Sequence, residues 1–200
     1  MKTLTLYFFR HGETAANTEG RYIGTTDEPI TMQSADMLEK FQKDGVYPSI
    51  EALYTSPLKR CLQSGILMYP GYNAIPVPNL AEYNFGDFEN KTGVELENND
   101  EYKAWIAGKT PAPPNGETGK DFTVRLCVGL RQIVEDMMKN DLRTAAVITH
   151  GGVIMTLFDA TALPRREKFS WMTDPGRGFA VRITPSLYHS NGIIEVTDII

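Results

Sequence analysis

An Arg-His pair stands at the end of the first apolar run of the chain, a position where many enzymes place reactive groups. The run covers residues 3 to 9, and Arg10, His11, Gly12 and Glu13 follow it. Ligands of open α/β sheets bind at the carboxyl ends of strands. A phosphate there could meet the Arg10 guanidinium and the N–H groups of the turn, with Gly12 leaving room for close approach. His11 would then face the phosphorus as a nucleophile.

A second polar cluster follows another short apolar run. Residues 143 to 148 form this run, and Thr149, His150, Gly151 and Gly152 come next. Small residues that open a helix favour an anion at its positive end, so Gly151 is a candidate phosphate-binding residue. Two separate strands thus deliver groups suited to the same anion.

Two more residues complete the candidate site. Ser56-Pro57 indicates a helix start capped by Ser56, and Arg60 lies one turn in, able to lean back toward the strand end. Glu82 precedes an irregular region and supplies a carboxyl group that can donate a proton. Each of these residues alone is more often structural or solvated. Their conjunction in chain order favours a site for phosphoryl transfer.

This chemistry requires particular protonation states. Phosphate monoester hydrolysis is among the slowest uncatalysed reactions, so the site must stabilise much charge. His11 must be neutral at the attacking nitrogen, with its other N–H held by a backbone carbonyl, and nearby arginines favour that state. We expect a protonated His150 beside Arg10 and Arg60. Glu82 must protonate the leaving alkoxide and then take a proton from water, and a pKa raised by the adjacent phosphate dianion suits both roles.

Short β-rich apolar runs alternate with helical patterns along the chain. Strands are predicted at 3–9, 50–54 and 143–148, and helices at 31–43, 56–68, 118–140 and from after Gly152 through Ala160. Late strands at 178–184 and 193–197, with the tight-turn signal Asn191-Gly192 between them, predict a hairpin. The alternation predicts an α/β fold, a three-layer α/β/α sandwich with a mostly parallel sheet and an antiparallel edge.

The length of 200 residues fits a single domain over residues 1–200. Between residues 83 and 117 the pattern breaks into short helices and the stretch KTPAPPNGE, which is too rich in proline and glycine for a core element. We predict that this segment is an insertion, or lid, over the active face.

The composition of the chain argues against several classes of binding partner. A net charge of -5 and a pI near 5.3 leave no basic patch for nucleic acid and no cationic run for a membrane. The first apolar stretch is too short for a signal peptide. Cys61 and Cys127 both fall in predicted helices, which favours buried thiols and a cytoplasmic protein. The three histidines, His11, His150 and His189, lack metal-ligand spacing, and we expect neither a metal nor a cofactor.

Taken together, the motifs resemble the histidine phosphatase superfamily, branch 1, also called phosphoglycerate mutase-like. The likeness rests on RHGET at 10–14, Asn17, EGRYIG at 19–24, DEPIT at 27–31, SPLKR at 56–60 and PNGET at 114–118. It spans residues 4 to about 152. The resemblance implies roles for six residues: His11 as nucleophile, Glu82 as general acid and base, Arg10, Arg60 and His150 as the phosphate pocket, and Asn17 as an extra phosphate or substrate contact.

Two positions depart from the family pattern. Ser34 stands where the family often has glycine, and Glu89-Asn90 replaces a common Glu-Gly. Neither is expected to touch the reacting groups. Both bear on the subfamily and its substrate.

We therefore predict a metal-independent phosphomonoester hydrolase that acts through a phosphohistidine on a small phosphorylated metabolite. The layout is similar to that of small broad-range phosphatases and of α-ribazole phosphatase, between which the sequence does not choose. A cofactor-dependent phosphoglycerate mutase is an alternative, although mutases add basic residues after the acid whereas residues 83 to 108 are acidic and aromatic. A non-catalytic phospho-ligand-binding module is another. The oligomeric state is unknown from sequence.

Overall fold

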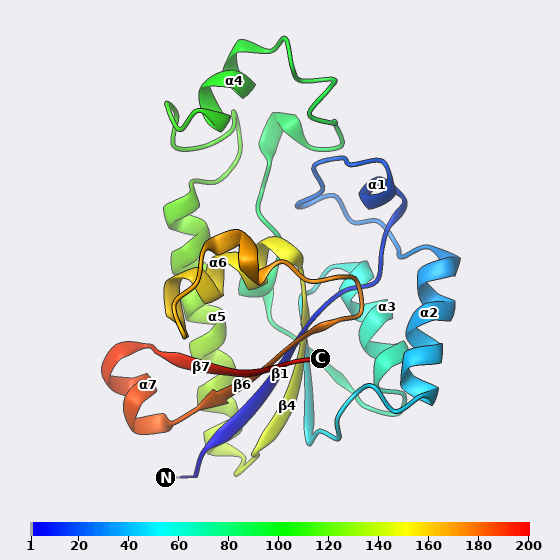
Figure 1. Cartoon of the computed structure of the whole chain (residues 1–200), viewed down its shortest axis with the longest axis vertical. Coiled ribbons are helices and arrows are strands. Elements are labelled where there is room, and N and C mark those ends of the chain that lie inside the picture. The colour runs from blue at the N-terminus through cyan, green and yellow to red at the C-terminus, as the bar shows by residue number, and fades with distance from the viewer. Residues whose placement is uncertain (1) are drawn as a thin grey trace.

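The computed structural model describes residues 2–200, and one sheet runs through this part of the chain. Its order is β3-β2-β4-β1-β6-β7-β5 (Figure 1). The strand bounds are Leu4–Arg10 for β1, Ala52–Thr55 for β2, Ala74–Pro76 for β3, Thr144–Thr149 for β4, Ala162–Leu163 for β5, Gly178–Ile183 for β6 and Ile194–Ile199 for β7. The short strands β3 and β5 were not predicted.

The pairing of β1 with β4 sets the position of the two candidate histidines. These strands are parallel, and Arg10 at the end of β1 is in register with Thr149 at the end of β4. His11 and His150 therefore leave the sheet side by side. Strands β2, β3 and β4 are also parallel, while β6 runs antiparallel to β1 and β7. The sheet is mostly parallel, as predicted.

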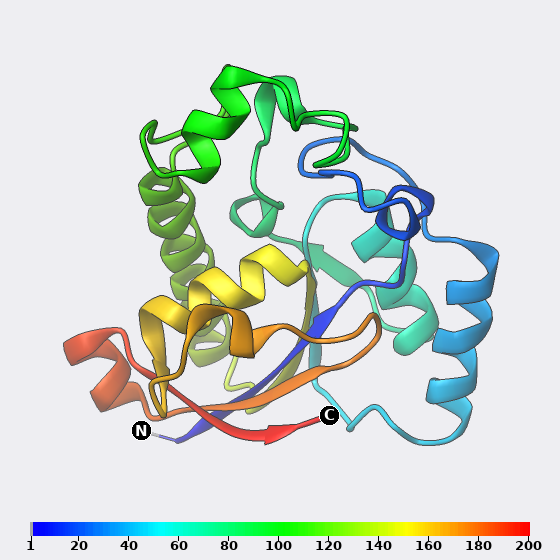
Figure 2. The ribbon, with the colours of Figure 1, turned by 45° about the horizontal axis from the view of Figure 1, so that its top comes forward.

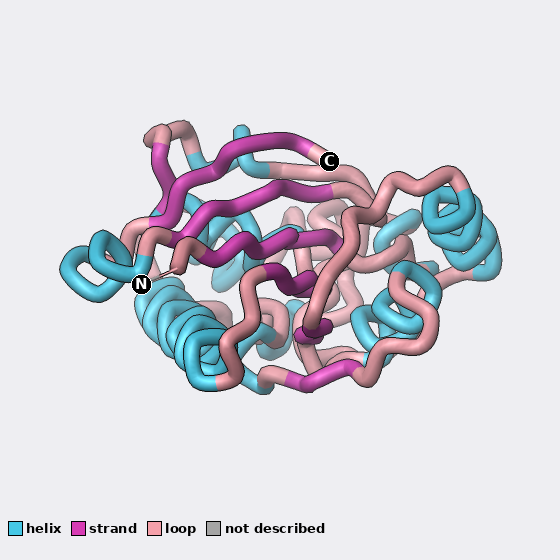
Figure 3. Tube along the Cα trace, turned by 90° about the horizontal axis from the view of Figure 1, so that it is seen from below, coloured by secondary structure: helices cyan, strands magenta, loops and turns pink. Residues whose placement is uncertain are grey.

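Helices cover both faces of the sheet, because alternate side chains of each strand point to opposite sides. On β4, Ala145 and Val147 join the core beneath α5 (Gly119–Lys139) and α6 (Gly151–Thr161). The intervening Ala146 and Ile148 join the core beneath α2 (Met32–Lys43) and α3 (Lys59–Met68). Seen from below, the strands lie between the two helical layers (Figure 3). This confirms the three-layer sandwich.

The predicted late hairpin is wrong in its connection. β6 and β7 do pair antiparallel, but α7 (Pro185–Asn191) lies between them. Gly192 adopts a left-handed conformation with φ 67° and ends α7. Asn-Gly suits both a tight turn and a helix C-terminus, because both need a positive φ. Pro185 in the first turn of α7 favours a helix before Asn191-Gly192, so this pair ends a helix and does not form a tight turn.

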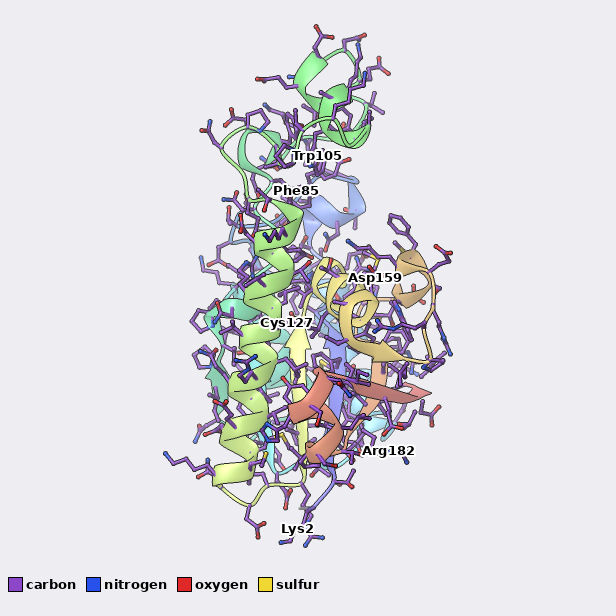
Figure 4. The ribbon with its side chains drawn as sticks, turned by 90° about the vertical axis from the view of Figure 1, so that its left-hand side faces the viewer. Lys2, Phe85, Trp105, Cys127, Asp159 and Arg182 are labelled. Atoms are coloured by element: carbon purple, nitrogen blue, oxygen red, sulfur yellow. The ribbon has the colours of Figure 1, made fainter. Side chains whose placement is uncertain are left out.

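The segment from 83 to 117 stands above the carboxyl ends of β1 and β4, together with the short helix α1 (Ala15–Thr18) (Figures 1 and 2). It contains α4 (Asp100–Ile106) and the 3-10 turn η2 (Gly86–Phe88), and a second 3-10 turn, η1 (Pro78–Leu80), precedes it. Its side chains form a small aromatic core of their own, in which the rings of Phe85 and Trp105 lie 6.2 Å apart (Figure 4). A further 3-10 turn, η3 (Lys168–Trp171), packs on α6. Within residues 2–200, no helix combines the length and the apolarity that a membrane crossing needs.

Candidate active site

His11 lies directly after β1, and its N–H donates to Thr149 O at 2.9 Å. Its ring Nδ1 lies 2.6 Å from the carbonyl oxygen of Gly12. A carbonyl only accepts, so Nδ1 carries the proton and Nε2 presents a lone pair. Burial, followed by the guanidinium groups of Arg60 and Arg10, lowers the pKa of His11 to about 3. The predicted neutral imidazole, held at its other nitrogen by a backbone carbonyl, is confirmed.

The backbone N–H groups of the turn after His11 were predicted to bind phosphate, but in the structure they have other partners. The N–H of Gly12 donates to Ser64 Oγ at 2.8 Å, and the N–H of Glu13 donates to Ser34 Oγ at 2.7 Å. These N–H groups are thus engaged with serine hydroxyls and not aimed at a phosphate. A Cβ at Gly12 would lie 2.6 Å from Ser34 Oγ and 3.0 Å from Leu38 Cδ1. The glycine is therefore needed for packing against α2.

Arg60 enters the site from the first turn of α3, with only 1% of its surface exposed. Its Nη2 donates to Gly24 O and its Nη1 to Thr26 O, both at 2.8 Å. Its Nε donates to His150 Nδ1 at 3.1 Å. These bonds use three of the five N–H groups of a guanidinium, which leaves one on each terminal nitrogen for an anion.

His150 lies between Arg60 and Ser56, and the predicted role of Ser56 as a helix cap is wrong. Helix α3 begins at Lys59 with Leu58 as its cap residue, so Ser56 does not cap it. Instead Ser56 Oγ lies 2.7 Å from His150 Nε2. A hydroxyl accepts as well as donates, and His150 Nδ1 already accepts from Arg60, so the ring proton sits on Nε2 and is donated to Ser56.

The predicted protonated His150 is wrong. Burial, followed by the adjacent charge of Arg60 and then by His11, lowers the pKa of His150 well below its ordinary value. The side chain is fully buried, and its ring centroid lies 5.0 Å from that of His11. A second cation against a buried guanidinium would be repelled without solvent to screen it. Both histidines are therefore neutral in this arrangement.

Glu82 lies two residues after the end of η1, and its carboxyl group reaches the start of α6. Its Oε1 accepts from the N–H of Tyr83 at 2.8 Å and its Oε2 from the N–H of Gly152 at 3.0 Å. Burial raises the pKa of Glu82 above its ordinary value, although these two bonds and the charges of Arg60 and Arg125 act in the opposite direction. The direction of the shift agrees with the expectation for a group that must carry a proton, but its cause here is burial, whereas the expected cause was a phosphate dianion.

Gly152 allows this close approach. A Cβ there would lie 2.4 Å from Glu82 Oε1 and 2.9 Å from its carboxyl carbon. The sequence analysis named Gly152 only as part of a helix start. Its neighbour Gly151 lies beside Arg10, where a Cβ would make an ordinary contact of 3.6 Å with Nε.

Arg125, which the sequence analysis missed, holds the backbone that carries Glu82. Its Nη1 donates to Asn79 O and Ala81 O, and its Nη2 donates to Glu82 O and to Glu117 Oε1. One guanidinium on α5 thus fixes the acid-bearing segment and the last part of the insertion. The available signal was a cation inside the apolar stripe of the helix at 118–140, next to Leu126.

Arg10 and Asn17 differ in how closely they join the site. Arg10 Nη1 donates to Thr173 O at 2.9 Å, and the neighbouring Glu82 carboxylate partly offsets the lowering of its pKa by burial. Asn17 forms a capping box with Thr14 at α1, in which its Oδ1 accepts the N–H of Thr14 at 3.2 Å. The Nδ2 group of Asn17 is left to donate to a ligand. No hydrogen bond in the described part of the chain joins it to the other candidate residues.

The structure therefore brings together a neutral imidazole, two guanidinium groups, a second neutral imidazole and a carboxyl group of raised pKa. These come from β1, α3, the start of α6 and the segment after η1. Such a set can bind a phosphate, attack its phosphorus and protonate a leaving group. Among residues 2–200, no cluster of three or more His, Cys, Asp or Glu side chains has the geometry of a metal site.

The low pKa of His11 predicts a pH dependence of stability. The unfolded imidazole titrates near pH 6.5, whereas the folded one titrates at about 3. Between these values the unfolded chain binds a proton that the native chain does not, so stability rises with pH. His11→Asn should reduce this slope by about 1.4 kcal/mol per pH unit between about pH 4 and 6, measured by urea unfolding.

The comparison variant is His189→Asn, which removes an exposed imidazole on α7 outside the candidate site. Equal slopes for wild type and His11→Asn would mean that burial does not keep His11 neutral. The argument for an unprotonated nucleophile would then fail.

Known proteins share both the sequence pattern and the fold. The family model described as histidine phosphatase superfamily (branch 1) matches residues 6–183. The chain is 27% identical over 187 residues to the adenosylcobalamin/α-ribazole phosphatase of Escherichia coli, and the alignment covers 90% of each protein. It is 25% identical over 167 residues to the 2,3-bisphosphoglycerate-dependent phosphoglycerate mutase of Rhizobium etli, and that alignment covers 76% of this chain and 78% of the mutase.

Among solved structures, the α-ribazole phosphatase of Shigella flexneri superimposes with a TM-score of 0.81 at 23% identity. That match covers 98% of this chain and 96% of the other. It shows the shared fold, and the family model covers most of the sequence that builds the site. The chain belongs to the histidine phosphatase superfamily, branch 1.

Proposed function

We propose that this protein hydrolyses phosphomonoesters of small metabolites through a phosphorylated His11. The observation that carries the proposal is the bond between His11 Nδ1 and Gly12 O, which leaves Nε2 unprotonated in a buried site beside Arg10 and Arg60. An imidazole would ordinarily be partly protonated near neutral pH and then could not attack. Here the nucleophile is ready without a separate base.

In the first step, His11 Nε2 attacks phosphorus and the bond from phosphorus to the ester oxygen breaks. The free N–H groups of Arg60 and those of Arg10 stabilise the charge on the other phosphoryl oxygens. Glu82 donates its proton to the leaving alkoxide, which departs as an alcohol. A carboxyl group with a raised pKa suits this role, because it holds a proton closer to neutral pH.

In the second step, water attacks the phosphohistidine and the bond from phosphorus to Nε2 breaks. Glu82, now a carboxylate, takes the proton from water, and inorganic phosphate leaves. His11 returns to its neutral form with the proton still on Nδ1. His150 does not react. It fixes the Arg60 guanidinium by accepting from Nε, and so forms one wall of the phosphate pocket.

The proposal extends to substrate, metal and location. The E. coli relative is named for α-ribazole phosphate chemistry, so α-ribazole 5′-phosphate is the first metabolite to assay. The reaction needs no metal ion, because imidazole is the nucleophile and the guanidinium groups supply the positive charge. The two free cysteines, Cys61 and Cys127, support a cytoplasmic location.

A phosphoglycerate mutase is the second candidate, because a mutase is among the relatives. A mutase must hold a second anionic group beside the acid. In the insertion, Lys91 Nζ donates to Asp87 O and Lys103 lies 3.7 Å from Asp100 Oδ1, so both cations are directed to their own segment. This favours hydrolysis. Phosphoglycerate turnover with and without 2,3-bisphosphoglycerate separates the two, since only a mutase depends on the bisphosphate.

The central test compares aryl and alkyl phosphate esters. His11→Ala should abolish hydrolysis of both and also the phosphoenzyme, which mass spectrometry detects after a base quench. Glu82→Gln should lose roughly 10²- to 10⁴-fold on alkyl esters, whose leaving group needs a proton, yet still release one burst of phenol from an aryl ester. Hydrolysis that survives in His11→Ala would refute the proposal. A burst of alcohol from the alkyl ester as fast as the burst of phenol from the aryl ester would remove Glu82 as the acid.

A further prediction concerns Gly152. The Cβ of Gly152→Ala would collide with Glu82 Oε1, so the carboxyl group must move away from the leaving group. We expect kcat on alkyl esters to fall by roughly 10²-fold, with the affinity for inorganic phosphate near that of wild type. Gly151→Ala, with an ordinary 3.6 Å contact to Arg10 Nε, should lose less. Similar losses in both variants would contradict a specific role for residue 152.

A further inference from the structure

The carboxylate of Glu89, in the insertion, accepts an unusual number of hydrogen bonds from one loop. The N–H groups of Gly24, Thr25 and Thr26 lie 3.0 to 3.3 Å from its oxygens, and the hydroxyl of Thr26 lies 2.7 Å from Oε2. The N–H of Phe85 adds a bond of 3.1 Å from within the insertion. Glu89 therefore fixes residues 24–26, the clamp loop, against the insertion.

The other side of the clamp loop faces Arg60. The carbonyl oxygens of Gly24 and Thr26 accept from the two terminal nitrogens of its guanidinium, each at 2.8 Å. The peptide group between Gly24 and Thr25 thus points its N–H at the carboxylate of Glu89 and its C=O at the guanidinium of Arg60. Hydrogen bonds to charged groups are stronger than neutral ones, and bonds in a chain polarise one another. Glu89 and Arg60 are coupled through this loop without touching.

Packing leaves the clamp loop little freedom. A Cβ at Gly24 would lie 1.7 Å from Tyr83 O, so only glycine allows the loop to lie against the residue that follows Glu82. On its other side, Asp27 Oδ1 accepts the N–H of Lys59 at 2.7 Å, which joins the loop to the start of α3. A shift of the loop would therefore shift the Arg60 guanidinium.

We propose that Glu89 is a positioning residue for the phosphate pocket, which acts through the clamp loop on Arg60. The proposal rests on the proposed function, because Arg60 is assigned there to the phosphate. The proposal also gives the insertion a second role besides covering the strand ends. Through Glu89, the insertion sets the affinity of the phosphate pocket, although Glu89 itself does not line that pocket. The alternative is that Glu89 only anchors the insertion, in which case its loss would lower stability alone.

The experiment measures binding of inorganic phosphate by calorimetry, which needs no turnover. Glu89→Gln places an amide NH₂ among N–H donors and should weaken phosphate binding about tenfold or more. The KM of an aryl ester should rise similarly, with a smaller change in kcat. Glu89→Asp, which keeps the charge on a shorter side chain, should fall between Glu89→Gln and wild type. The matched control is Glu95→Gln, because the exposed Glu95 bonds Arg21 and Thr92 but not the clamp loop.

A double variant separates positioning from anchoring. Arg60→Lys keeps the charge but cannot bond both carbonyls as the guanidinium does. In that background, Glu89→Gln should weaken phosphate binding by no more than about twofold further, since the coupling is already lost. Full additivity of the two losses, or wild-type phosphate affinity in a folded Glu89→Gln, would overturn the proposal.

Thr26→Val covers the case in which Glu89→Gln does not fold. It removes only the 2.7 Å hydroxyl bond to Glu89 Oε2 and keeps the side-chain shape. We expect phosphate binding to weaken roughly two- to tenfold, and unchanged binding would refute the clamp. If the wild type binds phosphate but hydrolyses no ester, the proposed function fails while the result for Glu89 stands.

Discussion

The site depends on the burial of one positive charge, that of Arg60. A guanidinium with 1% of its surface exposed must find acceptors inside the protein, because a buried unpaired charge is very costly. Its acceptors are the carbonyls of Gly24 and Thr26 and the Nδ1 of His150. The path of the loop at 24–26 and the orientation of the second histidine both follow from meeting this requirement.

Burial then shifts the titrating groups in opposite directions, and both shifts favour the neutral form. It lowers the pKa of His11 and raises that of Glu82. A neutral imidazole and a protonated carboxyl group are the forms that the first step of the proposed reaction requires. One dry environment therefore prepares the nucleophile and the acid together, with Arg10 and Arg60 reinforcing the neutral state of His11.

The sequence pointed to most residues of the candidate site, because its signals are local. Strand ends followed by Arg-His and His-Gly pointed to His11 and His150, and the parallel pairing of β1 and β4 places them together. The errors concern partners distant along the chain. Ser56 has the sequence context of a helix cap but bonds His150, and Gly12 serves packing against Ser34 and Leu38. Arg125, on α5, holds Glu82 through backbone carbonyls, which no side-chain motif reveals.

By itself the sequence determined the α/β sandwich and the strand ends that carry the candidate residues, since periodicity and residue type express these locally. Only the tertiary structure decided that His150 is neutral, that serine hydroxyls occupy the N–H groups of the first turn, and that Glu89 and Arg60 share a loop. Protonation depends on burial and on nearby charge. Hydrogen-bond partners depend on which backbone groups meet in space. Residues far apart in the chain determine both the protonation states and the hydrogen-bond partners. Their spacing along the sequence does not show that they come into contact.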